Sequence, residues 1–176
     1  MFEFLQKIVS FFQSHNIPYM LSGSVAMSIY TIPRATRDFD FVVHLQPKDV
    51  DSLTNHFSGA YYCDRDSINE AIQSVSMFNV IDHASGFKAD FVILKNEAFR
   101  QEEFNRRKKV VFEGLEIYIV SAEDLLLSKV IWIQDFQSGI QMDDILNLWE
   151  TEGIDKTYIR KWVNILKLNT FGLLDE

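Results

Sequence analysis

Two carboxylates, Asp38 and Asp40, lie two positions apart in the segment 34–43. The apolar run 41–43 follows them, so we expect a buried strand whose start carries both acids. In an extended chain, side chains at i and i+2 point to the same face, about 6–7 Å apart. Hard divalent cations prefer carboxylate oxygens, so this pair can bind metal ions that share a phosphate. The spacing therefore predicts phosphoryl or nucleotidyl transfer.

The acidic doublet is not specific by itself. Asp-x-Asp occurs twice more, at 49–51 and 64–66, in polar stretches that are typical of a helix start and of a loop. There we expect solvated or capping acids. What distinguishes Asp38 and Asp40 is the apolar strand that follows them.

Four further residues offer what phosphoryl chemistry needs, which is charge neutralisation and positioning. Gly23 allows close approach of the backbone to a phosphate, and Ser24 adds a hydroxyl and exposed amides at a helix start. Asp90 begins another apolar strand. If the two strands are neighbours, three carboxylates meet and one is free to act as a general base. Lys129, one helical turn past two leucines, is placed to reach a phosphate.

Each of these residues also has a purely structural interpretation. Asp90 fits a strand-end acid paired with Lys88 or Lys95, and Lys129 fits a surface lysine of a helix. The basic cluster at 100–109 is more typical of a solvated helix end before a strand than of a phosphate-binding surface. The order in which the candidate residues occur together is what favours catalysis.

Composition sets limits on the class of protein. A chain of 176 residues is one domain, or a core with a small appendage, and its net charge of −8 disfavours a protein that coats nucleic acid. There is no apolar run of about 18 residues and no basic leader, so we expect no membrane span or signal peptide. One cysteine, Cys63, excludes an intrachain disulfide framework and predicts a reducing, cytoplasmic location. The histidines lack metal-ligand spacing, and no P-loop motif occurs.

The periodicities predict an α/β fold, a mixed β-sheet flanked by helices with a C-terminal helical tail. We expect a core at 1–120 and C-terminal helices at 121–176, packed on the core as one compact unit, with a capping signal at Ser121. The expected helices are 2–15, 23–30, 47–57, 97–108, 125–136, 140–152 and 155–168. The expected strands are 19–21, 38–44, 74–81, 88–94, 110–112 and 115–120, with hairpin turns at 83–86 and 113–114.

The candidate residues together resemble the nucleotidyltransferase superfamily that shares the polymerase-β palm. The resemblance is greatest to the AbiEii-type toxins of abortive-infection systems and their uncharacterised bacterial relatives, and it covers roughly residues 15–165. It rests on Gly23-Ser24, Arg34-x-Thr36-x-Asp38-x-Asp40, Lys88-x-Asp90 and Ser121-x-Glu123-Asp124-Leu125-x-x-x-Lys129.

The resemblance implies a site and an activity. Asp38 and Asp40 would bind two Mg²⁺ ions, and Asp90 would complete the catalytic triad. The nucleotide-binding residues would be Gly23, Ser24, Arg34, Thr36 and Lys129. The implied enzyme moves a nucleotide from an NTP to a hydroxyl of RNA or protein, and one form of it is a toxin with an antitoxin partner.

One alternative stays open at this point. Relatives often carry Arg or Lys just before the acids of the helix after the lysine, whereas segment 137–144 has no basic residue, although it keeps Asp144. This departure favours a catalytically degenerate member that acts as a binding or regulatory module.

Overall fold

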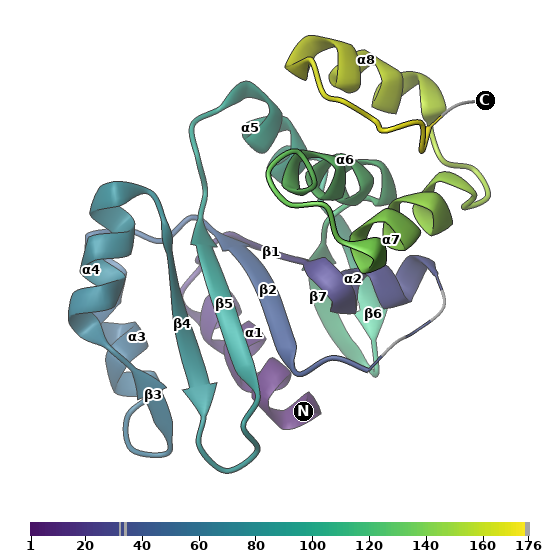
Figure 1. Cartoon of the computed structure of the whole chain (residues 1–176). Helices are drawn as coiled ribbons and strands as arrows, with labels where there is room; N and C mark the ends of the chain where they lie inside the picture. The colour runs from purple at the N-terminus through teal and green to yellow at the C-terminus, as the bar shows by residue number, and fades with distance from the viewer. Residues whose placement is uncertain (32, 34, 175–176) are drawn as a thin grey trace.

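The structure, a computed structural model, describes residues 1–31, 33 and 35–174. Within these residues, seven strands form one mixed sheet in the order β3-β4-β5-β2-β1-β7-β6 (Figure 1). The strands are β1 (Tyr19–Ser22), β2 (Asp38–Val43), β3 (Tyr61–Cys63), β4 (Met77–Asp82), β5 (Lys88–Ile93), β6 (Lys108–Phe112) and β7 (Leu115–Ile119). The α-helices are α1 (Phe2–Ser14), α2 (Gly23–Tyr30), α3 (Val50–His56), α4 (Arg65–Ser74), α5 (Ala98–Asn105), α6 (Ala122–Trp132), α7 (Gly139–Trp149) and α8 (Lys156–Leu166), and a 3-10 turn (Pro47–Asp49) precedes α3.

The centre of the sheet brings distant segments together. Strand β2 pairs antiparallel with β1 and parallel with β5. In this register Asp40 lies opposite Ser22 on one side and Asp90 on the other. The end of β1, where α2 begins, therefore lies beside the acids of β2 and β5.

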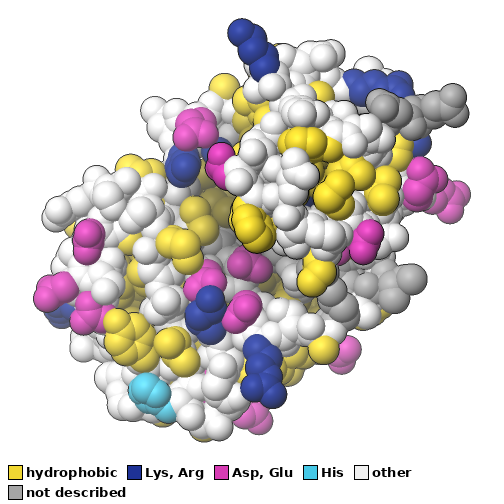
Figure 2. Space-filling view, viewed as in Figure 1, with side chains coloured by type: hydrophobic (Ala, Val, Ile, Leu, Met, Phe, Trp, Pro, Cys, Tyr) yellow, Lys and Arg dark blue, Asp and Glu magenta, His cyan; other side chains and the backbone are white. Residues whose placement is uncertain are grey.

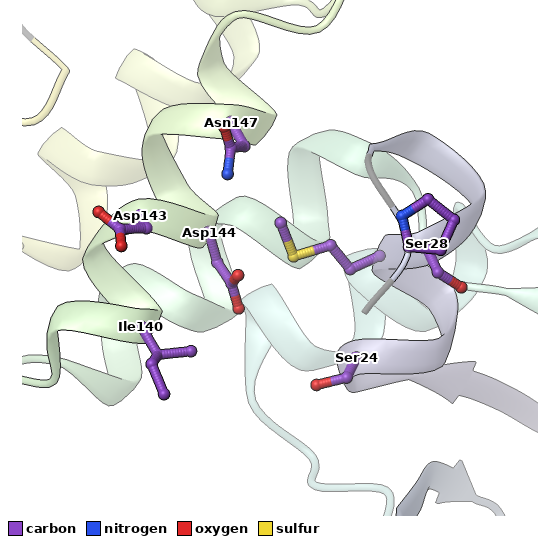
Figure 3. Close-up of a pocket in the computed structure, with 8 residues that line it drawn as sticks. Ser24, Ser28, Ile140, Asp143, Asp144 and Asn147 are labelled. Atoms are coloured by element: carbon purple, nitrogen blue, oxygen red, sulfur yellow. The ribbon is translucent and has the colours of Figure 1, made fainter. Parts of the chain in front are cut away.

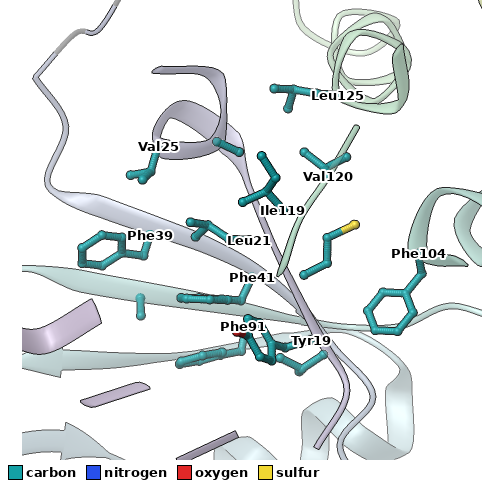
Figure 4. Close-up of a cluster of buried hydrophobic side chains, with 14 of the residues drawn as sticks. Tyr19, Leu21, Val25, Phe39, Phe41, Phe91, Phe104, Ile119, Val120 and Leu125 are labelled. Atoms are coloured by element: carbon teal, nitrogen blue, oxygen red, sulfur yellow. The ribbon is translucent and has the colours of Figure 1, made fainter. Parts of the chain in front are cut away.

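One face of the sheet is an aromatic core. Alternate residues of β2, among them Phe39 and Phe41, are fully buried because side chains of a strand point to opposite faces in turn. They meet Phe4 and Phe12 of α1 edge-on, with ring centroids 6.0 and 5.9 Å apart. Figure 4 shows Phe41 and Phe91 within this buried cluster. The carboxylates of β2 therefore point to the other face.

The helical tail packs on that second face and at the end of the sheet. Helix α6 contacts α2, α7 and α8 (Figure 1). Its start is the predicted capping signal, because the Ser121 hydroxyl accepts a hydrogen bond from the backbone N–H of Asp124 at 3.2 Å. In the described part of the chain, no helix has the length and apolar character needed to cross a membrane.

The structure corrects the expected elements at two places. Strand β3 and helix α4 were not predicted, and the acids at 64–66 do not lie in a loop, because Asp64 caps α4 by accepting from Ser67 N–H at 2.8 Å. The strand expected from 74 starts at Met77, since Ser74 still belongs to α4. A three-residue strand is too short to show a period, and helix α4 is largely polar with only two fully buried residues, so neither offered an apolar run.

Several boundaries also move. The helix expected to reach 108 ends at Asn105, so Lys108 and Lys109 lie on the edge strand β6. The helix expected at 125–136 runs from Ala122 to Trp132. Such ends depend on the last turn of each helix, where local propensity is weakest.

Candidate active site

Three carboxylates share one face of the sheet. Asp38 and Asp40 alternate with buried residues of β2, and Asp90 lies directly across from Asp40 in the parallel β2–β5 register. Asp38 is about half exposed, whereas Asp90 is largely buried. Figure 2 shows acidic side chains around a basic one near the middle of this face, next to a hollow.

The basic group among these acids is Lys88. Because it precedes Asp90 by two positions on β5, it points to the same face. Its Nζ donates to Asp90 Oδ2 at 2.8 Å and lies 3.9 Å from Asp38 Oδ1. The bond to Asp90 is the main cause that raises the pKa of Lys88. The predicted alternative, a pairing of Asp90 with Lys88, is thus present, while Lys95 lies near Glu97 instead.

Asp40 lies directly against Gly23. A Cβ added to Gly23 would come 1.8 Å from Asp40 Oδ2, and the φ of Gly23 is +63°, so this position requires glycine for two independent reasons. Burial, followed by the charges of Asp90 and Asp38, raises the pKa of Asp40. Among the described residues, no hydrogen bond or ion pair to the Asp40 carboxylate is found.

Lys129 is not a surface residue, and that alternative is wrong. It is 6% exposed, because α6 is apolar nearly all round and packs between α2 and α7. Its Nζ donates to Asp144 Oδ2 at 2.8 Å and to Gln141 Oε1 at 2.9 Å. Lys129 lines a cavity of about 240 Å³, whose wall also includes Gly23, Ser24 and Asp40.

Two more cavities adjoin this one and share its lining residues. A cavity of about 320 Å³ between α2 and α7 shares Ser24, and Figure 3 shows Ser24 and Asp144 directed toward it from the two helices. A third, of about 210 Å³ over β2 and β5, shares Asp40 and Ser128. We call the three adjoining cavities the groove; Asp40 lines two of them, whereas Asp38 and Asp90 line none of the three.

The start of α2 forms part of the wall of this groove. Ser22 is the N-cap residue but makes no capping hydrogen bond through its side chain. The positive end of the helix dipole favours an anion here.

Thr36, a predicted nucleotide-binding residue, lies outside the groove. The Thr36 hydroxyl accepts from the backbone N–H of Asp38 at 3.2 Å, so Thr36 holds the start of β2, and it lines none of these three cavities. Arg34 lies outside the described residues.

A polar cluster between α5 and α6 was missed. Arg100 Nη1 donates to Ser128 Oγ at 2.6 Å and to Glu103 Oε2 at 2.9 Å. Arg100 and Ser128 line the cavity over β2 and β5, and burial raises the pKa of Glu103. The sequence held one signal, the position of Ser128 directly before Lys129, but nothing indicated which helix would lie opposite.

The acids suit a hard cation by chemistry, but they are not arranged as a closed metal site. In the described part of the chain, no three His, Cys, Asp or Glu side chains converge on a point that would hold a metal ion. Asp90 Oδ1 is nevertheless buried without a hydrogen-bond partner, so the hydrogen-bonding capacity of this oxygen is unmet.

No protein-family model and no curated protein matches the sequence. Solved structures do match it. The solution structure of the antibiotic-resistance factor ANT(2'')-Ia is 11% identical, covers 93% of this chain and 89% of its own, and has a TM-score of 0.62. The crystal structure of ANT(2'')-Ia in complex with adenylyl-2''-tobramycin is 12% identical, covers 94% and 93%, and has a TM-score of 0.58.

JHP933 from Helicobacter pylori is 16% identical, with 94% of this chain and 72% of that chain covered at a TM-score of 0.50. Identities this low show the fold and nothing finer, so the resemblance to AbiEii-type toxins stays a prediction. The chain has the mixed-sheet nucleotidyltransferase fold that its motifs predicted.

Proposed function

We propose that this protein is a nucleotidyltransferase that moves a nucleoside monophosphate from an NTP to a hydroxyl acceptor. The observation that carries the proposal is the position of Asp40, which lines two of the three cavities and lies against Gly23 at the start of α2. The fold is compatible with this chemistry, since one protein that shares it was solved with adenylyl-2''-tobramycin, an adenylylated small molecule.

In the proposed reaction the acceptor oxygen forms a bond to the α-phosphorus, and the bond from that phosphorus to the bridging oxygen breaks. Pyrophosphate leaves, and the hydroxyl proton passes to a carboxylate. We assign the base role to Asp90, because its buried Oδ1 accepts no hydrogen bond among the described residues. Lys129 and the start of α2 would hold the leaving phosphates.

Of the three predicted metal-binding acids, Asp90 takes up the proton, so we propose that Asp38 and Asp40 hold the cofactor, Mg²⁺. When bound, it would neutralise the phosphate charge and polarise the reacting phosphoryl group. The chain already supplies one positive charge, because Lys88 contacts Asp90. Lys88 therefore neutralises part of the acidic cluster and holds Asp90 at its Oδ2, which leaves Oδ1 for the proton.

The acceptor and the biological role are further proposals. RNA or protein is the expected acceptor, and a toxin role with an antitoxin partner follows from the motif resemblance. One observation favours a second candidate, a catalytically inactive regulatory module: Lys129 is already paired with Asp144 and Gln141, so its charge is partly satisfied by the chain.

A labelling experiment separates enzyme from module. The protein is incubated with Mg²⁺, each radiolabelled NTP and cell lysate, and label on RNA and on protein is measured. Asp40→Asn and Asp90→Asn are each expected to lower labelling at least about 100-fold. The first removes a carboxylate that binds the metal ion and the second removes the general base, while the side-chain volume stays nearly the same.

The matched control is Asp66→Asn, an exposed acid of a second Asp-x-Asp doublet in the first turn of α4, which should label like the wild type. Wild-type protein that labels nothing with any NTP, and whose Tm does not respond to Mg²⁺ and nucleotide, would leave the regulatory module as the better description.

A further inference from the structure

An exposed tryptophan lines the groove beside the proposed phosphate site. Trp132 is 47% exposed, whereas the other two tryptophans, Trp149 and Trp162, are 2% and 8% exposed. It follows Lys129 by three positions on α6, so both side chains lie on the same side of the helix. The cavity of about 240 Å³ that contains Asp40 and Lys129 also has Trp132 in its wall.

A second aromatic ring supports the indole. Phe136 packs against Trp132 with ring centroids 5.5 Å apart and an interplanar angle of 87°, which is an edge contact. Phe136 is itself 64% exposed, so both rings are accessible. Together they form a small exposed aromatic surface beside the charged groups of the groove.

The polar wall of the same cavity supplies a donor. Gln141 accepts from Lys129 through Oε1, and in the described part of the chain no acceptor is found for its amide nitrogen. A planar ligand over the indole would therefore meet a hydrogen-bond donor at one edge and the Lys129 ammonium toward its phosphate end.

We propose that Trp132 is the platform on which the nucleobase of the NTP stacks. This inference rests on the proposed function and adds the position of the base: the reacting phosphate lies at Asp40, the remaining phosphates lie at Lys129 and the α2 start, and the base lies on Trp132. Stacking on an aromatic side chain tolerates all bases, because every base has a π face. The groove thus takes nucleoside triphosphates as a class.

Binding measurements on the intact protein test the platform. The dissociation constants of the four NTPs and of inorganic tripolyphosphate are measured by calorimetry with Mg²⁺ present. Trp132→Leu is expected to weaken NTP binding about 5- to 150-fold, the usual range for the loss of one base–aromatic stack. Tripolyphosphate binding should not change, because it has no base. Trp132→Phe should restore part of the NTP affinity.

Tryptophan fluorescence gives an independent readout. Because Trp149 and Trp162 are buried, quenching by NTP but not by tripolyphosphate reports on Trp132. The matched control is Tyr62→Leu, an exposed aromatic on the edge strand β3 outside the groove, which should bind NTP like the wild type.

The outcomes separate the two proposals. Equal NTP affinity in Trp132→Leu and wild type overturns the platform and leaves the nucleotidyltransferase proposal standing. The platform is also overturned if the wild type binds tripolyphosphate and NTP with equal affinity and NTP does not quench the tryptophan fluorescence. If neither NTP nor tripolyphosphate binds the wild type, the proposed function fails and the platform fails with it.

Discussion

Two clusters of charged side chains that are partly buried, one on the sheet and one at the start of the helical tail, are built in opposite ways. The first is the sheet cluster, which consists of Asp38, Asp40, Lys88 and Asp90. The second is the α6-start network, which consists of Arg106, Ser121, Glu123, Asp124 and Tyr158. Both place carboxylates where water is scarce, which costs free energy unless partners replace the lost solvation.

The α6-start network has those partners. Asp124 is 0% exposed, and it accepts from Arg106 Nε at 3.0 Å, from the Tyr158 hydroxyl at 2.6 Å and from the Ser121 hydroxyl at 2.6 Å. The Arg106 guanidinium also lies over the Tyr158 ring, 3.9 Å from its centroid. Burial and the bond to Asp124 raise the pKa of Tyr158, so its hydroxyl stays a donor. The network joins α5, α6 and α8.

The sheet cluster lacks such hydrogen-bond partners. Asp40 has no hydrogen-bond partner in the described part of the chain, its pKa is raised by burial and by neighbouring acids, and Asp90 Oδ1 is unpaired. A cluster with complete hydrogen bonding holds helices together, whereas an incomplete one leaves room for a ligand to supply the missing contacts. We therefore infer that the first cluster is functional and the second structural.

The largest expected effect separates the clusters by stability. Asp124→Ala removes one partner of a buried network and leaves Arg106, Ser121 and Tyr158 without their acceptor, so the free energy of unfolding should fall by about 3–5 kcal/mol. Urea unfolding followed by circular dichroism measures it. Asp90→Asn should leave the unfolding midpoint close to the wild type. An Asp124→Ala protein as stable as the wild type would remove the structural role of the network.

A smaller effect is expected where glycine meets the sheet cluster. Gly86→Ala in the β4–β5 turn (φ +69°) has open space around it, so it should cost only the left-handed backbone strain, about 1–2 kcal/mol. Gly23→Ala bears the same strain and also overlaps Asp40, which should cost about 1–3 kcal/mol more. Gly23→Ala should lose nucleotide labelling, whereas Gly86→Ala should keep it. Equal stability of the two variants would show that Asp40 moves away at little cost.

The smallest expected effect concerns pH. Because the pKa of Asp40 in the folded state is raised above its ordinary value of 3.8, the folded protein binds more protons there than the unfolded chain. The contribution of Asp40 to stability is therefore most favourable below the ordinary pKa and is lost as pH rises through the folded pKa. Asp40→Asn should thus be slightly more stable than the wild type at neutral pH.

Thermal unfolding of both proteins from acid to neutral pH measures this difference, which should vanish at low pH, where Asp40 is protonated in both states. A variant that is less stable than the wild type at neutral pH would mean that the carboxylate has stabilising contacts, and the contrast between the two clusters would fail.

Sequence reasoning succeeded for features that depend on near neighbours. The i, i+2 spacing of Asp38 and Asp40 placed both acids on one face of a strand, because the period of a strand is two. The Ser121 cap and the turn at Glu113 and Gly114, where φ is +50° and +80°, follow equally local rules. The apolar β2 and β5 runs indicated the strands that carry the acids.

Only the tertiary structure decided which charges meet. Lys129 meets Asp144 because α6 packs on α7, and Ser128 of α6 meets Arg100 of α5. Sequence spacing does not encode these distances, since they depend on how helices far apart in the chain are docked. The sequence thus determined that Asp38 and Asp40 lie on one strand and point to the same face of the sheet. The packing of α2, α6 and α7 determined the groove around them, because burial and pairing of charge arise only once distant elements are in contact.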